Sequence, residues 1–206
     1  MAFLTKIKLG SVNNLSDARY AAAAGIDYIG FCFDPTQAQY IVPIKAKEII
    51  DWIAGTVVVG EFGNQSIQEI SDISELLNID VIEVENGCYP DELKTLNQAI
   101  IKKVDIEQYN EASLRNELQA YASVADAFHF YVGSHNPDFD TTHALKLAND
   151  YRIIWGLDTH TGDIKNWVQS QHPFGINIIG GEEERPGIKD FDQIADILEQ
   201  LTIEEI

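Results

Sequence analysis

The strongest constraint on the fold of this chain is an alternation between short apolar runs and stretches with helical periodicity, which continues along the whole sequence. A strand-like run followed by a helix-like stretch occurs eight times, at intervals of roughly 20 to 25 residues. Such units place their strands parallel, because each helix carries the chain back along the sheet before the next strand. Eight units favour closure into a (β/α)8 TIM barrel, an α/β fold, over an open sheet.

Caps and breakers help to place the boundaries of these units. Gly25 stands where a helix C-terminus takes a glycine, and Ser66 stands where a hydroxyl can cap a helix N-terminus. In a barrel of this kind the functional groups lie at the carboxyl ends of the strands. Strands are predicted over 3–9, 26–33, 56–62, 79–84, 99–104, 127–132, 152–157 and 174–179. Helices are predicted over 15–24, 44–54, from the Ser66 cap to 77, and over 91–96, 112–122, 141–149, 163–170 and 191–201.

Composition limits both the domain count and the class of partner. With 206 residues, 45% of them hydrophobic and 23% charged, the chain is expected to form one globular domain over 1–206. Asp and Glu number 33 against 14 Lys and Arg, which gives a formal net charge of −19. A surface of that sign repels nucleic acid and anionic membranes at long range, so neither is expected as a partner.

Cysteine usage and the N-terminus indicate the compartment. Cys32 and Cys88 are far apart in the sequence and are expected as reduced thiols. The N-terminus runs directly into a strand pattern and lacks the apolar core of a signal peptide. No apolar run approaches the ~18 residues that a membrane helix needs. A soluble, acidic, cytoplasmic protein is therefore expected.

The stretch from Phe174 to Asp190 has the composition of an anion site. Its apolar run ends at Gly180-Gly181, and a helix is predicted to begin near Lys189. Glycine backbone just after a strand and beside a helix N-terminus can direct several N–H groups toward an anion. The sequence therefore predicts a ligand contact at this end of the chain.

The same stretch resembles the eighth strand and phosphate loop of the phosphoribosylanthranilate isomerase family, in which a Ser-Gly-Val-Glu turn leads into Pro-Gly-Val-Lys-Asp. Here the turn reads Gly-Gly-Glu-Glu over 180–183, and Pro-Gly-Ile-Lys-Asp over 186–190 keeps the second motif. Further matches follow in order along nearly the whole chain: Leu-Ser-Asp-Ala at 15–18, Gly-Phe-Cys-Phe at 30–33, Tyr-Ile-Val-Pro at 40–43 and Val-Gly-Glu-Phe-Gly-Asn at 59–64.

The resemblance implies an Amadori isomerisation in tryptophan biosynthesis. In that reaction a general acid protonates the ring oxygen of a phosphorylated ribosylamine, and a general base removes a proton from C2′ of the resulting Schiff base. No cofactor and no metal are expected. The expected partner is a small molecule, phosphorylated or not, and the chain is expected to be a monomer or a homodimer.

The position of the family's base has changed in this chain. That base is the Cys that ends the first strand, and ungapped counting from Asp17 places it at Gly10, which has no side chain. Lys8 lies two residues earlier on the same face of the strand and could replace the base if burial lowered its pKa. The favoured alternative for Lys8 is a surface or ion-paired lysine. Glu61 is a second substitute base.

The position of the family's acid has changed as well. That acid is an Asp that ends the sixth strand, and the position falls on Tyr131, or on Gly133 if the register slips by two. A tyrosine with a pKa of ~10 donates a hydrogen bond but is a poor acid at neutral pH. A packed aromatic ring at the rim of the barrel is the favoured interpretation, and Tyr131 as a substitute acid is the alternative.

The phosphate loops are altered in both bulk and charge. Trp155 adds bulk after the seventh strand, where backbone should approach a phosphate. The extra carboxylates of Glu182 and Glu184 would each oppose an anion at ~6 Å by ~2 to 3 kcal/mol at an effective dielectric near 20. The residues predicted to bind a phosphate or another ligand are Gly156, Gly180, Gly181 and Arg185.

Carboxylates at the predicted strand ends open the alternative of a different site. A convergent group with histidines nearby could bind a divalent metal or perform acid–base chemistry. Their spacing matches no defined metal motif, and polar strand ends are common in an acidic barrel. His129 is expected to be a satisfied core histidine, and Cys32 a packing residue. The carboxylates are Asp34, Glu61, Glu85, Asp105 and Asp158, the histidines His129, His135 and His160, and the predicted pocket residues Asp34, Gln39, Glu85, Asp105 and Asp158.

The sequence therefore predicts a diverged barrel that keeps a small-molecule pocket at the strand C-termini and is not efficient in the family's isomerisation. An active isomerase with substitute acid and base groups is one alternative. Another enzyme that uses the carboxylates, or a non-catalytic binding or interaction protein, remains possible because a fold does not fix a function.

Overall fold

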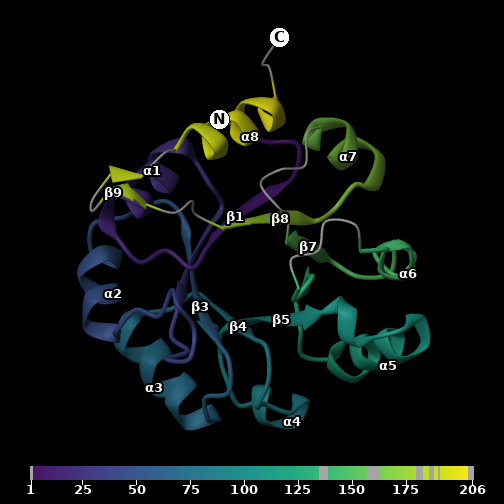
Figure 1. The fold of residues 1–206 in the computed structure, drawn as a ribbon. Coiled ribbons are helices and arrows are strands. Elements are labelled where there is room, and N and C mark those ends of the chain that lie inside the picture. Colours follow the sequence, from purple (N-terminus) through teal and green to yellow (C-terminus); the bar gives the residue numbers. More distant parts are fainter. Residues whose placement is uncertain are drawn as a thin grey trace.

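Eight parallel strands close into a barrel in the computed structural model of the chain (Figure 1). The structure describes residues 2–134, 139–156, 163–179, 183–185, 188–189 and 191–203. Each strand pairs with the next, and the last pairs with the first in parallel, so the predicted TIM barrel is confirmed. The strands are β1 (Lys6–Gly10), β2 (Tyr28–Cys32), β3 (Val57–Phe62), β4 (Val81–Val84), β5 (Ala99–Asp105), β6 (Ala127–Tyr131), β7 (Ile153–Gly156) and β8 (Gly175–Ile179).

Helices form a ring around the barrel, as Figure 1 shows in projection along its axis. The predicted caps are present: Gly25 is left-handed, with φ 79°, and the Ser66 side chain accepts a hydrogen bond from the Glu69 N–H in a capping box. The helices are α1 (Leu15–Ala24), α2 (Pro43–Ile50), α3 (Ile67–Leu77), α4 (Pro90–Leu93), α5 (Glu111–Tyr121), α6 (Thr142–Leu145), α7 (Ile164–Gln171) and α8 (Asp192–Leu201).

Side-chain alternation along the strands separates an inner core from an outer one. Val59, Val81, Ile101, Ala127 and Ile154 come from five successive strands and form one buried cluster, which requires that all five face the barrel interior. The residues between them face outward and pack against the helices. Positions two residues further along each strand therefore face the interior one layer nearer to its carboxyl end.

Three helices, α2, α4 and α6, are shorter than predicted because their last turns tighten; after α2 the N–H groups of Trp52 and Ile53 donate to carbonyls three residues back. After Leu93 the N–H groups of Thr95 and Leu96 donate to carbonyls three residues back, and the chain after α6 does the same at 147 and 148. Such i to i−3 bonds end the α-helical pattern while keeping the chain compact. A short 3₁₀ helix, Ile106–Gln108, also follows β5 and was not predicted.

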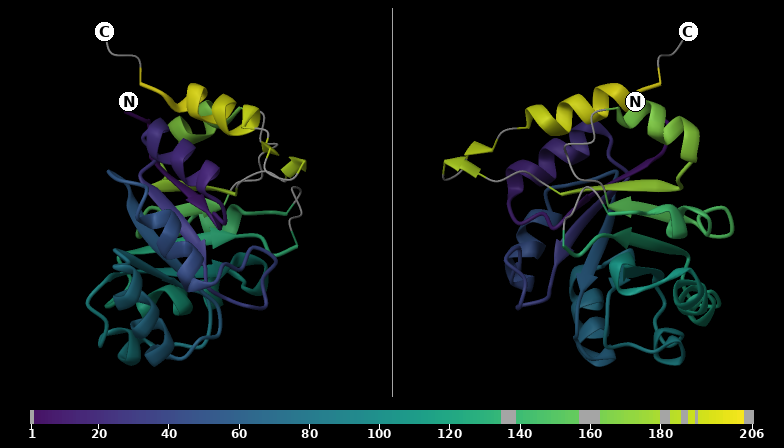
Figure 2. Two further views of the ribbon diagram at one scale, coloured as in Figure 1. Left: turned by 90° about the vertical axis from the view of Figure 1, so that its left-hand side faces the viewer. Right: turned by 45° about the vertical axis from the view of Figure 1, so that its right-hand side comes forward.

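The segment before α8 differs from its prediction. A two-stranded antiparallel pair, β9 (Glu183–Arg185) and β10 (Ile188–Lys189), occupies the region where a helix was expected to begin, and α8 starts only at Asp192. This pair stands outside the barrel, near the N-terminal end of α8 (Figure 2). Backbone pairing between the two short strands therefore replaces a direct passage from the glycine turn into the helix.

The thiols and the helix lengths complete the description of the fold. Cys32 and Cys88 are both buried and free, as predicted. Burial raises the pKa of the Cys32 thiol to about 11, which suits packing better than nucleophilic chemistry. Within the described ranges, every helix falls short of the length and apolar character needed to span a bilayer.

Candidate functional site

A line of polar side chains crosses the barrel interior. The Nζ atom of Lys8 lies 2.5 Å from Oε1 of Glu61 and 3.1 Å from Oε2 of Glu83. The same Glu83 oxygen lies 3.1 Å from Nδ1 of His129. We call Lys8, Glu61, Glu83 and His129 the inner polar cluster; it joins β1, β3, β4 and β6.

Ion pairing decides the charge states in this cluster. Burial lowers the pKa of Lys8, but the attraction and hydrogen bonds of Glu61 and Glu83 outweigh it and leave the pKa raised. Burial likewise opposes ionisation of Glu83, yet Lys8 and His129 hold its pKa below the ordinary value. Lys8 is thus the ion-paired lysine that the sequence favoured, and it lacks the lowered pKa that a lysine base requires.

Glu61 fills the space left by the missing side chain at the predicted base position. A Cβ atom added at Gly10 would lie 2.8 Å from Oδ1 of Asn177 and 3.2 Å from Oε1 of Glu61. The other Glu61 oxygen accepts hydrogen bonds from the N–H and hydroxyl groups of Ser11, whose φ is 55°. A carboxylate from β3 therefore stands beside the end of β1.

Tyr131, at the predicted acid position, is tied to a neighbouring carboxylate. Its hydroxyl donates to Oε1 of Glu85, and Nζ of Lys103 lies 3.0 Å from Oε2 of the same carboxylate and 4.4 Å from the centre of the Tyr131 ring. Burial, the hydrogen bond and the charge of Glu85 raise the pKa of Tyr131. The ring is half-buried at the rim, and the phenol is a weaker acid than an ordinary tyrosine.

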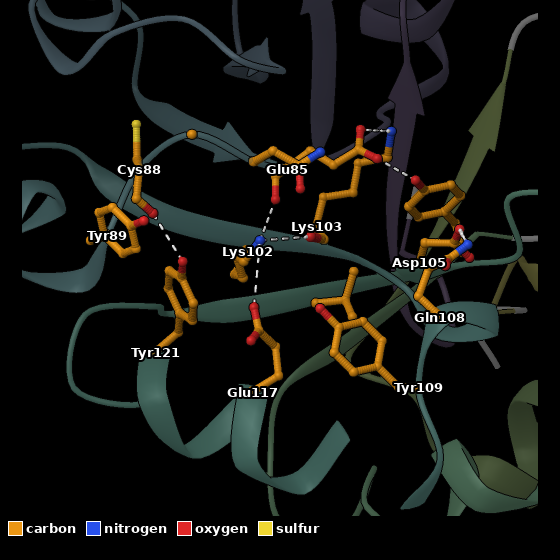
Figure 3. A pocket seen from close by; sticks show the side chains of 14 residues that line it. Glu85, Cys88, Tyr89, Lys102, Lys103, Asp105, Gln108, Tyr109, Glu117 and Tyr121 are labelled. Carbon is orange, nitrogen blue, oxygen red and sulfur yellow. Dashed lines mark hydrogen bonds and ion pairs between the residues drawn. The ribbon is translucent and has the colours of Figure 1, made fainter. Parts of the chain in front are cut away.

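A pocket of about 350 Å³ lies at the ends of β4, β5 and β6 (Figure 3), and Tyr131, Glu85 and Lys103 are among the residues that line it. On its outer side Nζ of Lys102 donates to the backbone carbonyl of Glu85 and lies 3.9 Å from Oε1 of Glu117. Burial lowers the pKa of Lys102. The pocket is lined by Glu85, Asn86, Gly87, Cys88, Tyr89, Lys102, Lys103, Val104, Asp105, Gln108, Tyr109, Glu117, Tyr121 and Tyr131.

The predicted carboxylates separate into different environments. Glu85 and Asp105 line this pocket, whereas Asp34 turns back to accept hydrogen bonds from the N–H and hydroxyl groups of Thr36. Gln39 is exposed in the loop before α2. Across the described ranges, no three His, Cys, Asp or Glu side chains gather closely enough to hold a metal ion.

Asp105 stands beside Gly133, just after β6, as Glu61 stands beside Gly10 of β1. Its Oδ1 atom accepts a hydrogen bond from the Gly133 N–H at 3.0 Å, and its carboxylate occupies the place of a side chain at Gly133. Gly133 is the alternative acid position that a register slip of two would select. A carboxylate from another strand thus stands at each glycine: Glu61 of β3 at Gly10, and Asp105 of β5 at Gly133.

Trp155 was predicted to add bulk where backbone should approach a phosphate. It faces outward and packs edge-on against Phe130 and Trp167, whereas Ile154 and Gly156 are the residues of β7 that face inward. The prediction was wrong because it did not ask whether the Trp155 side chain lies on the inner or the outer face of the strand. Gly180, Gly181, Asp158, His135 and His160 lie outside the described residues, and Arg185 is described only as part of the β9 backbone.

His129 is only half satisfied, which corrects its prediction as a satisfied core histidine. Its Nδ1 atom pairs with Glu83, but Nε2 is buried and lacks a hydrogen-bond partner within the described part of the chain. Glu83, Lys103 and Asn177 were not predicted as site residues. The available signal was polarity at inward positions of otherwise apolar strands.

The eight parallel strands form a closed barrel and carry polar side chains at and below their carboxyl ends. These features place the chain in the class of (β/α)8-barrel proteins, which have their functional site at that end. The chain matches the family described as PRAI: N-(5'phosphoribosyl)anthranilate (PRA) isomerase over residues 7–200. It therefore belongs to the N-(5'-phosphoribosyl)anthranilate isomerase family, as the sequence motifs predicted.

Relatives and solved structures agree with this assignment. The chain is 28% identical to an N-(5'-phosphoribosyl)anthranilate isomerase of Pelodictyon phaeoclathratiforme, covering 91% of this chain and 93% of that protein. It is 30% identical to one of Chlorobium phaeobacteroides, covering 93% and 94%. The phosphoribosyl anthranilate isomerase of Thermus thermophilus has the same fold, with a TM-score of 0.80 at 22% identity and coverage of 95% and 98%.

Two further solved structures have the same fold. A phosphoribosyl anthranilate isomerase in complex with reduced 1-(o-carboxyphenylamino)-1-deoxyribulose 5-phosphate matches with a TM-score of 0.80 at 22% identity, covering 95% of this chain and 97% of that one. Monomers made from the dimeric enzyme of Thermotoga maritima match with a TM-score of 0.80 at 21% identity, covering 95% and 97%.

Proposed function

We propose that this chain is a diverged member of its family that binds a small molecule at the strand C-termini and performs the Amadori isomerisation inefficiently. The observation that carries the proposal is Gly10, which offers no basic side chain. The room beside it is already taken, since a Cβ atom there would approach Asn177 and Glu61 to 2.8 and 3.2 Å. Loss of a general base commonly costs a factor of about 10² to 10⁴ in rate.

The state of Tyr131 supports the same proposal. A general acid works best when its pKa lies near the working pH, and the raised pKa of Tyr131 moves it away from neutrality. Its hydroxyl proton is also engaged by Glu85. Tyr131 is thus suited to positioning Glu85 rather than to protonating a sugar ring oxygen.

The pocket supports the binding half of the proposal. It opens at the carboxyl ends of β4, β5 and β6 and combines ionic groups with four tyrosine rings, Tyr89, Tyr109, Tyr121 and Tyr131. Polar groups that converge in a concavity of this size are typical of small-molecule sites.

The test is turnover of phosphoribosylanthranilate by the purified protein, followed through anthranilate fluorescence. We expect turnover at least about 10²-fold below the 1 to 10³ s⁻¹ of ordinary enzymes, since base and acid are both replaced. We also expect the compound to raise the unfolding temperature. Turnover within the ordinary range would contradict the proposal, and a melting temperature unaffected by the compound would remove its binding half.

One observation favours an active isomerase as the second candidate. Glu61 brings a carboxylate to within 3.2 Å of the point where the side chain of residue 10 would begin, and Asp105 stands over Gly133. Under this candidate Glu61 replaces the base and Asp105 the acid. Glu61→Gln would then abolish turnover while the surface control Glu75→Gln would not, and equal turnover in both variants would exclude Glu61 as the base.

A further inference from the structure

Lys102 is a buried lysine on the outer face of the barrel. It lies on β5 between Ile100 and Val104, which pack into the apolar layer beneath the helices, and it is 5% exposed. A lysine at such depth either has a close counter-ion or loses part of its preference for the charged form. The contacts of its amine therefore decide which of the two applies.

The amine of Lys102 is held mainly by neutral groups. Its Nζ atom donates to the backbone carbonyl of Glu85 and, at 3.3 Å, to that of Lys103. In the described part of the chain the single carboxylate within 4.0 Å is that of Glu117, whose Oε1 atom is 3.9 Å away, too far for a hydrogen bond. Figure 3 shows the three contacts diverging from Nζ. A neutral amine has two N–H groups and one lone pair, so the two carbonyls satisfy both donors and the lone pair is left on the side of Glu117.

The pocket gives this nitrogen both a desolvated environment and an approach. Lys102 lines the cavity of about 350 Å³, and the face of the Tyr121 ring lies 4.9 Å from Nζ. Burial lowers the pKa of Lys102 more than the charges of Glu117 and Glu85 raise it. Desolvated lysines with an open approach are the ones that form covalent bonds with carbonyl compounds.

The adjacent lysine of the same pocket is engaged differently. Nζ of Lys103 lies 3.0 Å from Oε2 of Glu85 and 4.4 Å from the centre of the Tyr131 ring. Lys103 is therefore directly ion-paired, whereas Lys102 reaches its carboxylate only across a gap. This contrast provides an internal comparison between two lysines of one pocket.

We propose that Lys102 forms a Schiff base with a small aldehyde bound in this pocket, and that Glu117 carries the protons of the reaction. An aldehyde oxygen about 2.8 Å from both Nζ and the Glu117 carboxylate would bridge their separation of 3.9 Å. The proposal shares its pocket with the proposed function and goes beyond it, because it assigns covalent chemistry to a residue outside the family's isomerisation positions.

The reaction is balanced without a further reactant. Glu117 takes a proton from the Lys102 ammonium, and the lone pair that is left forms an N–C bond with the carbonyl carbon. The carbonyl π pair moves to oxygen, which takes that proton from Glu117. Glu117 then moves a second proton from nitrogen to the new hydroxyl, and the C–O bond breaks with its pair on the departing water while nitrogen forms the C=N bond. Ammonium and aldehyde thus give iminium and water, and Glu117 ends as a carboxylate.

The experiment traps the imine in the folded protein with glycolaldehyde and sodium cyanoborohydride, and peptide mass spectrometry locates the reduced adduct on each lysine. The exposed Lys45 is the reference, and Lys103 is the internal comparison. We expect Lys102 to be labelled at least about tenfold faster than either, because a positioned acid–base group contributes about 10² to 10⁴ in rate. An unlabelled Lys102, or one labelled no faster than Lys45, would overturn the proposal and leave Lys102 as a structural lysine.

Two variants on α5 test the part assigned to Glu117. Glu117→Gln keeps the size of the side chain, removes the proton carrier and should slow labelling of Lys102 about tenfold or more, with Lys45 unaffected. Glu111→Gln, which removes a carboxylate paired with Lys146 on the same helix, should leave all three rates unchanged. Equal labelling of Lys102 in both variants would refute the role of Glu117. Turnover of phosphoribosylanthranilate and its effect on the melting temperature are separate readouts, so a failure here is distinguishable from a failure of the proposed function.

Discussion

Charged residues inside this barrel occur where each finds an opposite charge. Lys8 is 1% exposed and is placed between two carboxylates, and Glu83 is shared by Lys8 and His129. An uncompensated ion at such depth would cost several kcal/mol. The pKa shifts in the cluster therefore have opposite consequences for stability at low and at high pH.

The first prediction is that stability falls on both sides of a central pH range. The pKa of His129 is lowered from 6.5 in the folded protein. The contribution of neutral His129 to the free energy of unfolding is therefore complete above about pH 6.5, and it is lost as the pH falls below that value. The pKa of Lys8 is raised from 10.5, so its contribution is complete below about pH 10.5 and is lost as the pH rises through the folded-state pKa. The measurement is urea unfolding as a function of pH, for the wild type and His129→Asn.

His129→Asn acts as the control for the acid side, because it removes that titration and leaves the surface charges of the protein unchanged. The difference in free energy of unfolding between the two proteins should shrink between about pH 7 and about pH 5, as the wild type loses its contribution from neutral His129. A difference that stays constant over this interval would contradict the prediction.

At the scale of elements, the ion pairs of the inner polar cluster connect strands that do not pair: Lys8 of β1 contacts β3 and β4, and Glu83 of β4 contacts His129 of β6. Hydrogen bonds join β1 to β2 and β8, whereas Lys8 reaches from β1 across the interior to β3 and β4. Outward-facing apolar residues attach each strand to its helices. The cluster therefore ties together opposite parts of the barrel wall.

The second prediction concerns this link. Lys8→Met should destabilise the protein by roughly 3 to 5 kcal/mol, because it leaves two buried carboxylates without their cation. Lys6→Met is the matched control on the same strand: Lys6 is half-exposed and pairs with Asp27 at 2.6 Å, and loss of a surface pair costs about 0 to 1 kcal/mol. Urea unfolding measures both, and a smaller loss for Lys8→Met than for Lys6→Met would contradict the account.

At the scale of the whole molecule, the formal net charge of −19 on 206 residues is the dominant electrostatic feature. In the described part of the chain the buried carboxylates are only Asp17, Asp34, Glu61 and Glu83. The other described carboxylates are at least partly exposed, and like charges on a surface repel one another in the compact state. Buried pairs are screened by salt much less than exposed charges are. Added salt should therefore weaken the repulsion between surface carboxylates and leave the ion pairs of the inner polar cluster intact.

The third prediction is that potassium chloride stabilises the protein. Raising the concentration from about 0.01 M to about 0.1 M shortens the Debye length from about 30 Å to about 10 Å. We expect the melting temperature to rise by roughly 2 to 4 °C, the shift that about 1 kcal/mol gives in a chain of this size. Sucrose at matched osmolality is the control for non-electrostatic effects. A melting temperature that falls with salt would show that favourable surface pairs outweigh the repulsion.

The sequence by itself determined the closed barrel, the order of its units and the helix ends at Gly25 and Ser66. Periodicity and capping depend on a few neighbouring residues, so they can be recognised in a single sequence. The family motifs in the sequence also predicted the isomerase family, and the family model matches residues 7–200. The short pair β9–β10 escaped prediction because strands of three and two residues have too few positions to show a period.

Only the tertiary structure decided which side chains meet inside the barrel. Lys8 and Glu61 are 53 residues apart, Glu83 and His129 are 46 apart, and closure of the sheet alone brings them together. Whether Trp155 or Gly156 faces the interior also depended on strand register, since a shift of one residue exchanges the two faces. Fold follows from local pattern, whereas the charge state and direction of each buried group depend on neighbours supplied by distant parts of the chain.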